Sequence, residues 1–144
     1  MIVKSIKNGF ISGVKCCWFL IKVIVPVYFC ITILKNTPAM DWLASLFAPL
    51  MGVFRLPGEA AVPLITTIAL DEYGVIAAIK AVGLTGFAVT VVGVMSMITH
   101  SIIVEAAILN RMGMNAVFFA AYRIFASIIV GLVLSALGVV FHLW

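Results

Sequence analysis

The chain has 144 residues, of which 65% are hydrophobic and 10% charged, and its formal net charge is +4. Average soluble domains are about 45–50% apolar and about 25% charged, so this composition excludes a soluble body, whose helices would be apolar on every face. The basic residues form no cluster interleaved with aromatic side chains, which argues against a nucleic-acid partner and fits a membrane topology instead.

The first part of the chain predicts two helices. Residues 1–14 alternate apolar and basic side chains, which indicates a short amphipathic helix lying at the membrane interface. Residues 16–34 form an apolar run long enough to span, because about 20 residues cross a hydrocarbon core of about 30 Å. The run resembles a signal peptide, but Lys22 interrupts it, and we expect it to be retained. Pro26 is expected to kink this spanning helix.

Shorter apolar segments follow, and then two long ones. Residues 42–54 are too short to cross comfortably and predict an interfacial helix. Residues 57–83 contain two short apolar arms joined by the charged turn at 71–74, which predicts a broken-helix hairpin that enters the membrane part way. Full spanning helices are predicted at residues 84–109 and 115–143. The expected fold is therefore an all-α, multi-pass integral membrane protein of the inner membrane, with about three full spans and one hairpin.

The last predicted helix carries small residues at four-residue intervals: Ser127, Gly131 and Ser135. This small-xxx-small pattern lets membrane helices approach closely, and predicts packing within the chain or across a dimer. Arg123 is the only Asp, Glu, Lys or Arg in this segment. We expect it either to snorkel or to pair with an acidic side chain, the candidates being Asp71, Glu72 and Glu105.

A first candidate site lies where residues 57–83 begin. Glu59 follows a Pro-Gly pair, Pro63 lies one turn deeper, and Thr66 and Thr67 come next. Non-helical backbone at membrane depth survives only where protein buries it or water reaches it, and ionisable residues there are costly. These four residues are therefore predicted to line a binding cavity. In the alternative, Glu59 only stabilises a helix N-terminus.

A second candidate site lies in "MITHSIIVEAAILN", residues 97–110. Ser101 and Glu105 are four residues apart and share one helix face. Thr99 and His100 adjoin that face, and Asn110 ends the segment. These five residues are predicted to bind substrate, although a lone His100 bonded to the backbone is an alternative.

Neither candidate site has the signature of an enzyme or a metal centre. Glu59, His100 and Glu105 lack the spacing of metal ligands, and one histidine is too few. No GxSxG, P-loop, HExxH or Rossmann glycine pattern occurs in the sequence. We expect no catalytic residue, no bound metal and no resident cofactor.

Three stretches resemble one known family: "LPGEAAVPLI" (56–65), "LTG" (84–86) and "THSIIVEAAILNRMGMN" (99–115). They are similar to the Gate, or nucleoside-recognition, domain of bacterial spore maturation proteins and small permease-like membrane proteins. Related domains occur in concentrative nucleoside transporters and ferrous-iron transporters. The resemblance covers roughly residues 15–140.

The resemblance implies a membrane gate or transport element. Glu59 and Pro63 match its first motif, and His100, Ser101 and Glu105 match its last. The chain carries about one Gate unit, whereas many transporters carry two in inverted orientation. We therefore expect half of a secondary transporter for a nucleoside-like solute or an ion, working in the lipid bilayer as a homodimer or with a second Gate subunit.

The resemblance leaves two further points open. Coupling to H⁺ or Na⁺ through Glu59 or Glu105 is expected if the chain transports. The alternative function is a non-transport scaffold or assembly subunit of a membrane complex.

Overall fold

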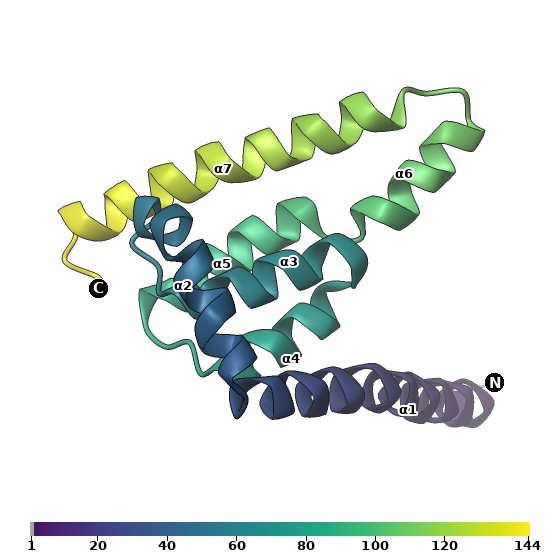
Figure 1. The fold of residues 1–144 in the computed structure, drawn as a ribbon. Coiled ribbons are helices and arrows are strands. Elements are labelled where there is room, and N and C mark those ends of the chain that lie inside the picture. Colours follow the sequence, from purple (N-terminus) through teal and green to yellow (C-terminus); the bar gives the residue numbers. More distant parts are fainter. Residues whose placement is uncertain (1) are drawn as a thin grey trace.

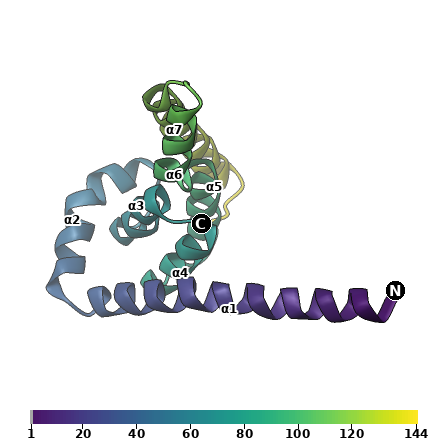
Figure 2. The same cartoon turned by 90° about the vertical axis from the view of Figure 1, so that its right-hand side faces the viewer.

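A computed structural model describes residues 2–144, giving the backbone alone for residues 2, 3, 20, 23 and 69. Within this range the chain forms only helices and loops (Figure 1). Helices α3, α4 and α5 lie between α1 on one side and α7 on the other (Figures 1 and 2). Three helical segments, Lys4–Lys35, Phe87–Arg111 and Ala116–Val140, are long and apolar enough to cross a membrane, and one further pair is sharply bent. The predicted all-α membrane fold is confirmed.

Helix α1 (Ile2–Lys35) joins two segments that the sequence separated, 1–14 and 16–34. It is continuous because nothing near residue 15 ends a helix, and it also continues through Pro26. Met1 lies outside the described residues. Only 6% of the apolar window of α1 is buried, and Figure 2 shows the helix extending well past the others. Its interfacial and spanning parts stay predictions.

Helix α2 (Pro38–Val53) begins with a proline at its first position, where the missing N–H leaves no intrahelical bond unmade. It therefore starts earlier than the predicted segment 42–54. After a loop, the 3₁₀ turn η1 (Gly58–Ala60) leads into α3 (Ala61–Ala69). The direction changes by 91° between the two helical parts. Gly58 is required at this bend, because a Cβ there would collide with the carbonyl oxygen of Ala44.

Helices α3 and α4 (Glu72–Val82) correspond to the two arms of the hairpin predicted at 57–83. The Asp71 carboxylate accepts a hydrogen bond from the Gly74 N–H at 3.1 Å and so caps α4. Gly83 ends α4 in the left-handed conformation, with φ +80°. How deep the hairpin enters a membrane stays a prediction.

The segment predicted as one span at 84–109 forms two helices, α5 (Phe87–Thr99) and α6 (Ile102–Arg111). His100 is extended and Ser101 is left-handed, with φ +52°. No proline or glycine marks this break, so the sequence pattern did not reveal it.

Helix α7 (Ala116–Val140) packs its small-residue stripe inside the chain. The Ser127 hydroxyl donates to the Met95 carbonyl at 3.1 Å, and the Ser135 hydroxyl donates to the Phe54 carbonyl at 2.8 Å. The stripe was predicted to pack either within the chain or across a dimer, and in the structure it packs within the chain.

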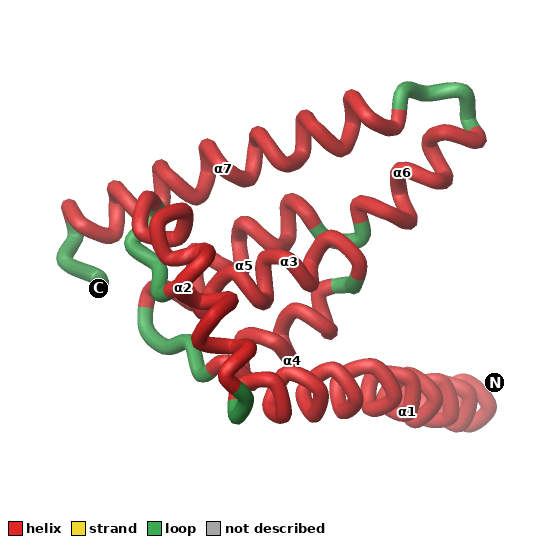
Figure 3. Tube along the Cα trace, viewed as in Figure 1, coloured by secondary structure: helices red, strands yellow, loops and turns green. Residues whose placement is uncertain are grey.

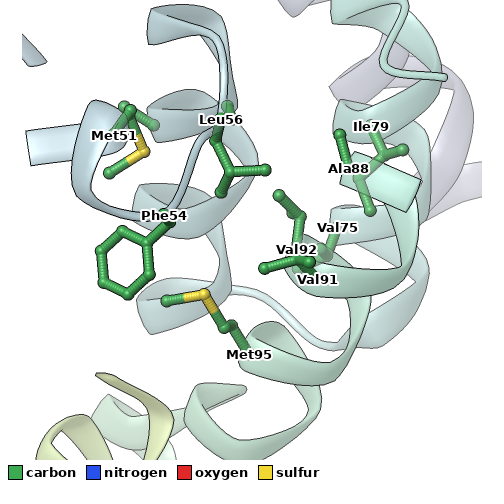
Figure 4. Close-up of a cluster of buried hydrophobic side chains, with 11 residues drawn as sticks. Met51, Phe54, Leu56, Val75, Ile79, Ala88, Val91, Val92 and Met95 are labelled. Carbon is green, nitrogen blue, oxygen red and sulfur yellow. The ribbon is translucent and has the colours of Figure 1, made fainter. Parts of the chain in front are cut away.

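The main apolar core lies between the end of α2 and helices α4 and α5. Figure 4 shows Met51, Phe54 and Leu56 across from Val91, Val92 and Met95, and the cluster also includes Val75, Ile79 and Ala88. Burying a valine fully contributes about 1.5–3 kcal/mol. This core holds α5 in place, and with it the break between α5 and α6.

Candidate functional site

Four helix ends meet at one place, which we call the helix crossing: the end of α3, the start of α4, the end of α5 and the start of α6. The Ser101 N–H donates to the carbonyls of Thr67 at 2.9 Å and Leu70 at 3.1 Å. In Figure 3 the loop joining α3 to α4 lies beside the loop joining α5 to α6. The broken segment of α5 and α6 is thus bonded to the end of the hairpin's first arm.

The carbonyls in the last turn of α5 are bonded by side chains. The Thr67 hydroxyl donates to Ser96 O at 3.1 Å, and His100 Nδ1 lies 2.7 Å from Met97 O. Arg123 Nε donates to Ile98 O. The last four carbonyls of a helix have no partner in their own helix, and leaving one unpaired in an apolar setting costs free energy. These side chains allow α5 to end inside the protein.

Four charged or titratable side chains form a chain across the crossing. Arg123 of α7 pairs with Glu105 of α6, so the structure selects Glu105 from its three predicted partners. His100 Nε2 lies 3.1 Å from Glu72 Oε1 and 3.8 Å from Glu105 Oε1. The Arg123 side chain is 13% exposed, whereas those of Glu105 and Glu72 are 36% and 42% exposed. The chain of charges therefore runs from the protein interior to its surface.

The two ring nitrogens of His100 face different partners. Nδ1 lies 2.7 Å from the Met97 carbonyl oxygen and 3.5 Å from Arg123 Nη2, whereas Nε2 faces the carboxylates of Glu72 and Glu105. With a neutral imidazole, the two carboxylates and one guanidinium give the cluster a formal charge of −1.

A cavity of about 260 Å³ lies between α4 and α5, next to the crossing. Glu72 and Ser96 are the two polar residues among its lining, but the surface exposed to the cavity is almost entirely apolar. Ser96 is 2% exposed, and its hydroxyl has no hydrogen-bond partner among the described residues. The remaining lining residues are Val75, Ile76, Ile79, Gly93 and Met97.

The structure gathers most of the second predicted site. His100, Ser101 and Glu105 meet at the crossing, and Thr67 from the first predicted site joins them. Thr99 lies at the end of α5, where its hydroxyl donates to Met95 O at 2.9 Å.

Four predicted site residues are placed differently. Glu59 lies at the opposite end of α3, about 13 Å away for nine residues of helix, and its carboxylate has no recorded hydrogen bond or ion pair within residues 2–144. Pro63 is buried, and the Thr66 hydroxyl donates to Val62 O and Pro63 O within its own helix. Asn110 is exposed near the end of α6. Their roles as binding residues stay predictions.

Three residues of this region were not among the predicted site residues: Glu72, Ser96 and Arg123. Arg123 could have been predicted as a site residue, because a lone arginine in an apolar helix needs a partner. Glu72 was assigned only to a charged turn. Nothing in the sequence indicated that the Ser96 hydroxyl would lack a partner, because a serine in a helix ordinarily bonds a carbonyl one turn earlier.

An apolar groove of about 350 Å³ lies on another side, between α7 and helices α2, α3 and α5. Its only polar lining residues, Thr99 and Ser127, both donate to Met95 O. The groove therefore offers apolar contact and almost no free hydrogen-bonding group.

Comparisons with known proteins agree on one family. Residues 17–141 match the family described as Gate, nucleoside recognition. The chain is 39% identical over 116 residues to the uncharacterized membrane protein YvoD of Bacillus subtilis (strain 168). This match covers 81% of the chain and 37% of the relative, so the chain spans little more than a third of that protein's length. No solved structure matches.

Proposed function

This chain belongs to the Gate, or nucleoside recognition, family, and from that premise we propose that it is half of a secondary transporter for a small solute. The match bears out the family resemblance of the three sequence motifs. Gate domains are a membrane family associated with transporters and are not an enzyme family. Its solute, its partner and its placement in the inner membrane as a multi-pass protein belong to this proposal.

The observation that carries the proposal is the helix crossing. Transporters of several folds bind their solutes near the membrane midplane, where discontinuous helices aim their ends at the site. Here α5 ends and α6 begins inside a segment of 25 residues that is long enough to span. The side chains of Arg123, Glu105, His100 and Glu72 converge on that break. Charged groups inside a spanning segment are costly enough to indicate a solute or ion pathway.

Proton coupling follows from the same residues. Nε2 of His100 has Glu72 of α4 and Glu105 of α6 within 4 Å, while Arg123 of α7 holds Glu105. The other nearby acid, Asp71, is occupied by the Gly74 N–H. A histidine side chain can carry a proton, and no oxygen cage for Na⁺ is needed for that. Of the expected coupling ions, these contacts therefore favour H⁺ over Na⁺, and of the two expected carboxylates they favour Glu105 over Glu59.

A second subunit would complete the pathway. The chain has one Gate unit, and its apolar groove lies beside the crossing, with Thr99 in both. We propose that a second copy, or a related Gate subunit, packs there in the bilayer. Native mass spectrometry in nanodiscs tests this point, and a purely monomeric species would contradict it.

The transport proposal is tested in proteoliposomes with an imposed pH gradient. They are incubated with small metabolites extracted from bacterial cells, washed, and analysed by mass spectrometry. We expect one or more solutes to accumulate with the wild type, and to stop accumulating when a protonophore dissipates the gradient. Glu72→Gln should reduce uptake at least 10-fold, because it removes a carboxylate from His100 without unpairing Arg123.

Glu59→Gln is the matched control. Uptake should stay near the wild-type level, since Glu59 lies at the far end of α3. The reverse pattern, with Glu59→Gln inactive and Glu72→Gln active, would favour the site predicted from the first motif. No uptake of any solute would refute transport.

One observation favours the alternative of a scaffold or assembly subunit. Helix α1 extends away from the other helices, and little of its surface is covered by them. A membrane partner could pack along it. Recovery of a stoichiometric partner protein in native mass spectra, together with the absence of uptake, would support this reading.

A further inference from the structure

A pocket of about 400 Å³ opens between the last turns of α7 and the loop that follows α2, and its lining residues are Arg55, Gly138, Val139, His142 and Trp144. We propose that this pocket binds the phosphate group of an anionic phospholipid, whose acyl chains lie along the apolar side chains at the end of α7. Gly138 lies about 22 Å along α7 from Arg123. The inference therefore concerns a site separate from the helix crossing and goes beyond the transport proposal.

Helices α2 and α7 end in the same backbone motif. Arg55 follows α2 and His142 follows α7, and both residues are left-handed, with φ +56° and +52°. At each end, the N–H of the left-handed residue bonds the carbonyl three residues earlier, and the next N–H bonds the carbonyl five residues earlier, at 2.9–3.2 Å. This is the Schellman motif, whose left-handed position is usually glycine. Here both positions are basic.

Neither basic side chain is used to close its own helix. The carbonyls bonded in the two motifs receive backbone N–H groups, and Phe54 O receives the Ser135 hydroxyl. Within residues 2–144 the side chains of Arg55 and His142 have no recorded ion pair or hydrogen bond. Glycine would adopt the same backbone with less strain, and strained residues cluster at ligand-binding sites. The two side chains are therefore available to a ligand.

Helix packing holds the two ends together. The Ser135 hydroxyl donates to Phe54 O at 2.8 Å, and in Figure 1 the loop after α2 lies beside the last turns of α7. Trp144 packs edge-on against Phe87 of α5, with ring centroids 5.4 Å apart. Gly138 leaves room for this pair, because a Cβ there would lie 2.5 Å from the Phe87 ring and 2.8 Å from Trp144 Nε1. The pocket is therefore a product of the packing of α2, α5 and α7.

The lining offers hydrogen-bond donors and a positive charge, and it contains no carboxylate. The Arg55 guanidinium has five N–H donors and can hold a phosphate with two of them. The His142 ring and the Trp144 indole each add an N–H donor. A phosphodiester brings acceptor oxygens and one negative charge. A cationic ligand would meet Arg55 with no acid in the lining to offset it.

The surroundings of the pocket favour a lipid over a soluble phosphate ester. Helix α7 is long and apolar enough to cross a membrane, so its end would lie near the headgroups, a depth at which tryptophan is enriched. In the last turns of α7 the side chains of Leu137, Val140 and Phe141 are exposed. Acyl chains would cover them, whereas a soluble ligand would not.

The experiment compares lipids with identical acyl chains: anionic phosphatidylglycerol, zwitterionic phosphatidylcholine, and diacylglycerol, which has no phosphate. Native mass spectrometry measures their binding to the whole chain in detergent micelles. We expect phosphatidylglycerol to bind about 10-fold more tightly than either of the others, because only it brings a net negative charge to Arg55. Equal binding of the three lipids would overturn the proposal. Glycerol 3-phosphate that binds as tightly as phosphatidylglycerol would overturn the assignment to a lipid.

Four variants locate the site. Arg55→Gln should weaken phosphatidylglycerol binding about 10-fold, and His142→Ala and Trp144→Phe about 3-fold each, by loss of a donor. Arg111→Gln is the matched control, because it removes the same charge from an exposed residue at the end of α6 that does not line the pocket. Binding by this control should equal that of the wild type. Unchanged binding by Arg55→Gln, or an equal loss with Arg111→Gln, would refute the site.

Arg55→Gly separates lipid binding from folding. Glycine adopts φ +56° without strain, so in lipid-free micelles the variant should unfold at the same temperature as the wild type or a higher one. Added phosphatidylglycerol should raise the unfolding temperature of the wild type and raise that of Arg55→Gly much less. An equal rise in both proteins would overturn the proposal. Solute uptake in proteoliposomes is a separate measurement, so its failure would refute transport and leave this site standing.

Discussion

Replacing Arg123 with methionine should destabilise the protein, and the structure allows the size of the effect to be worked out. The substitution keeps an unbranched side chain but removes the donor to Ile98 O and the charge that pairs with Glu105. A buried carbonyl left without a partner costs about 1–3 kcal/mol. Breaking a fully buried ion pair costs about 3–5 kcal/mol, but Glu105 is 36% exposed, so we discount this contribution to about 1–2 kcal/mol. The expected loss is about 2–5 kcal/mol.

A double-mutant cycle separates the two contributions. Arg123→Met, Glu105→Gln and the double variant are unfolded reversibly in mixed micelles, and their free energies of unfolding are compared. The double variant leaves no unpaired carboxylate, so it should be more stable than Arg123→Met by about 1–2 kcal/mol. A loss below about 1 kcal/mol for Arg123→Met, or a double variant no more stable than that single variant, would refute the reasoning.

Three further predictions concern backbone and packing, and all are measured by the same unfolding assay. Gly131→Ala should lower the free energy of unfolding by about 1–3 kcal/mol, because its new Cβ would press on the Met95 side chain. Gly9→Ala in α1, where space is open, should be neutral or stabilising. Equal effects of the two substitutions would contradict the packing of α7 on α5. Ser101→Gly should gain up to about 1 kcal/mol, since glycine adopts φ +52° without strain and the lost hydroxyl contact is long, at 3.4 Å; a clear loss would mean that the hydroxyl matters more than the backbone. Asp71→Ala should lose about 1 kcal/mol by removing the N-cap of α4, while Asp71→Asn should retain most of the stability.

Local signals in the sequence predicted much of the fold. Long apolar runs marked α1 and α7, and proline with glycine marked the bend at Pro57 and Gly58. The turn between α3 and α4 followed from its charged residues. Two features of the fold could not be predicted from such local patterns. Helix α1 is continuous through an apparent change of pattern near residue 15, and α5 breaks at His100 and Ser101 although neither residue is a helix breaker.

The candidate site was also predicted only in part, because sequence patterns report on neighbouring residues and not on contacts between distant segments. Residues close in sequence, such as His100 and Glu105, could be grouped by helical spacing. The break that brings them to α3 depends on hydrogen bonds from Ser101 to carbonyls about 30 residues earlier in the chain, which no local pattern encodes. Glu59 had a persuasive local setting, yet α3 separates it from the crossing. Of the two expectations for Arg123, snorkelling and pairing, the structure shows pairing, with one of the three acids named.

The side chains that bond the final carbonyls of α5 come from α3, from the connection to α6 and from α7. A displacement of α3 or α7 of little more than an ångström would therefore strand a carbonyl where water is scarce. Intermediate positions of these helices, in which a carbonyl has lost its donor, are unfavourable. A shift that brings each donor to a new acceptor does not carry this cost. Movement at this place should occur as a jump between two discrete arrangements, with α3, α5 and α7 changing together.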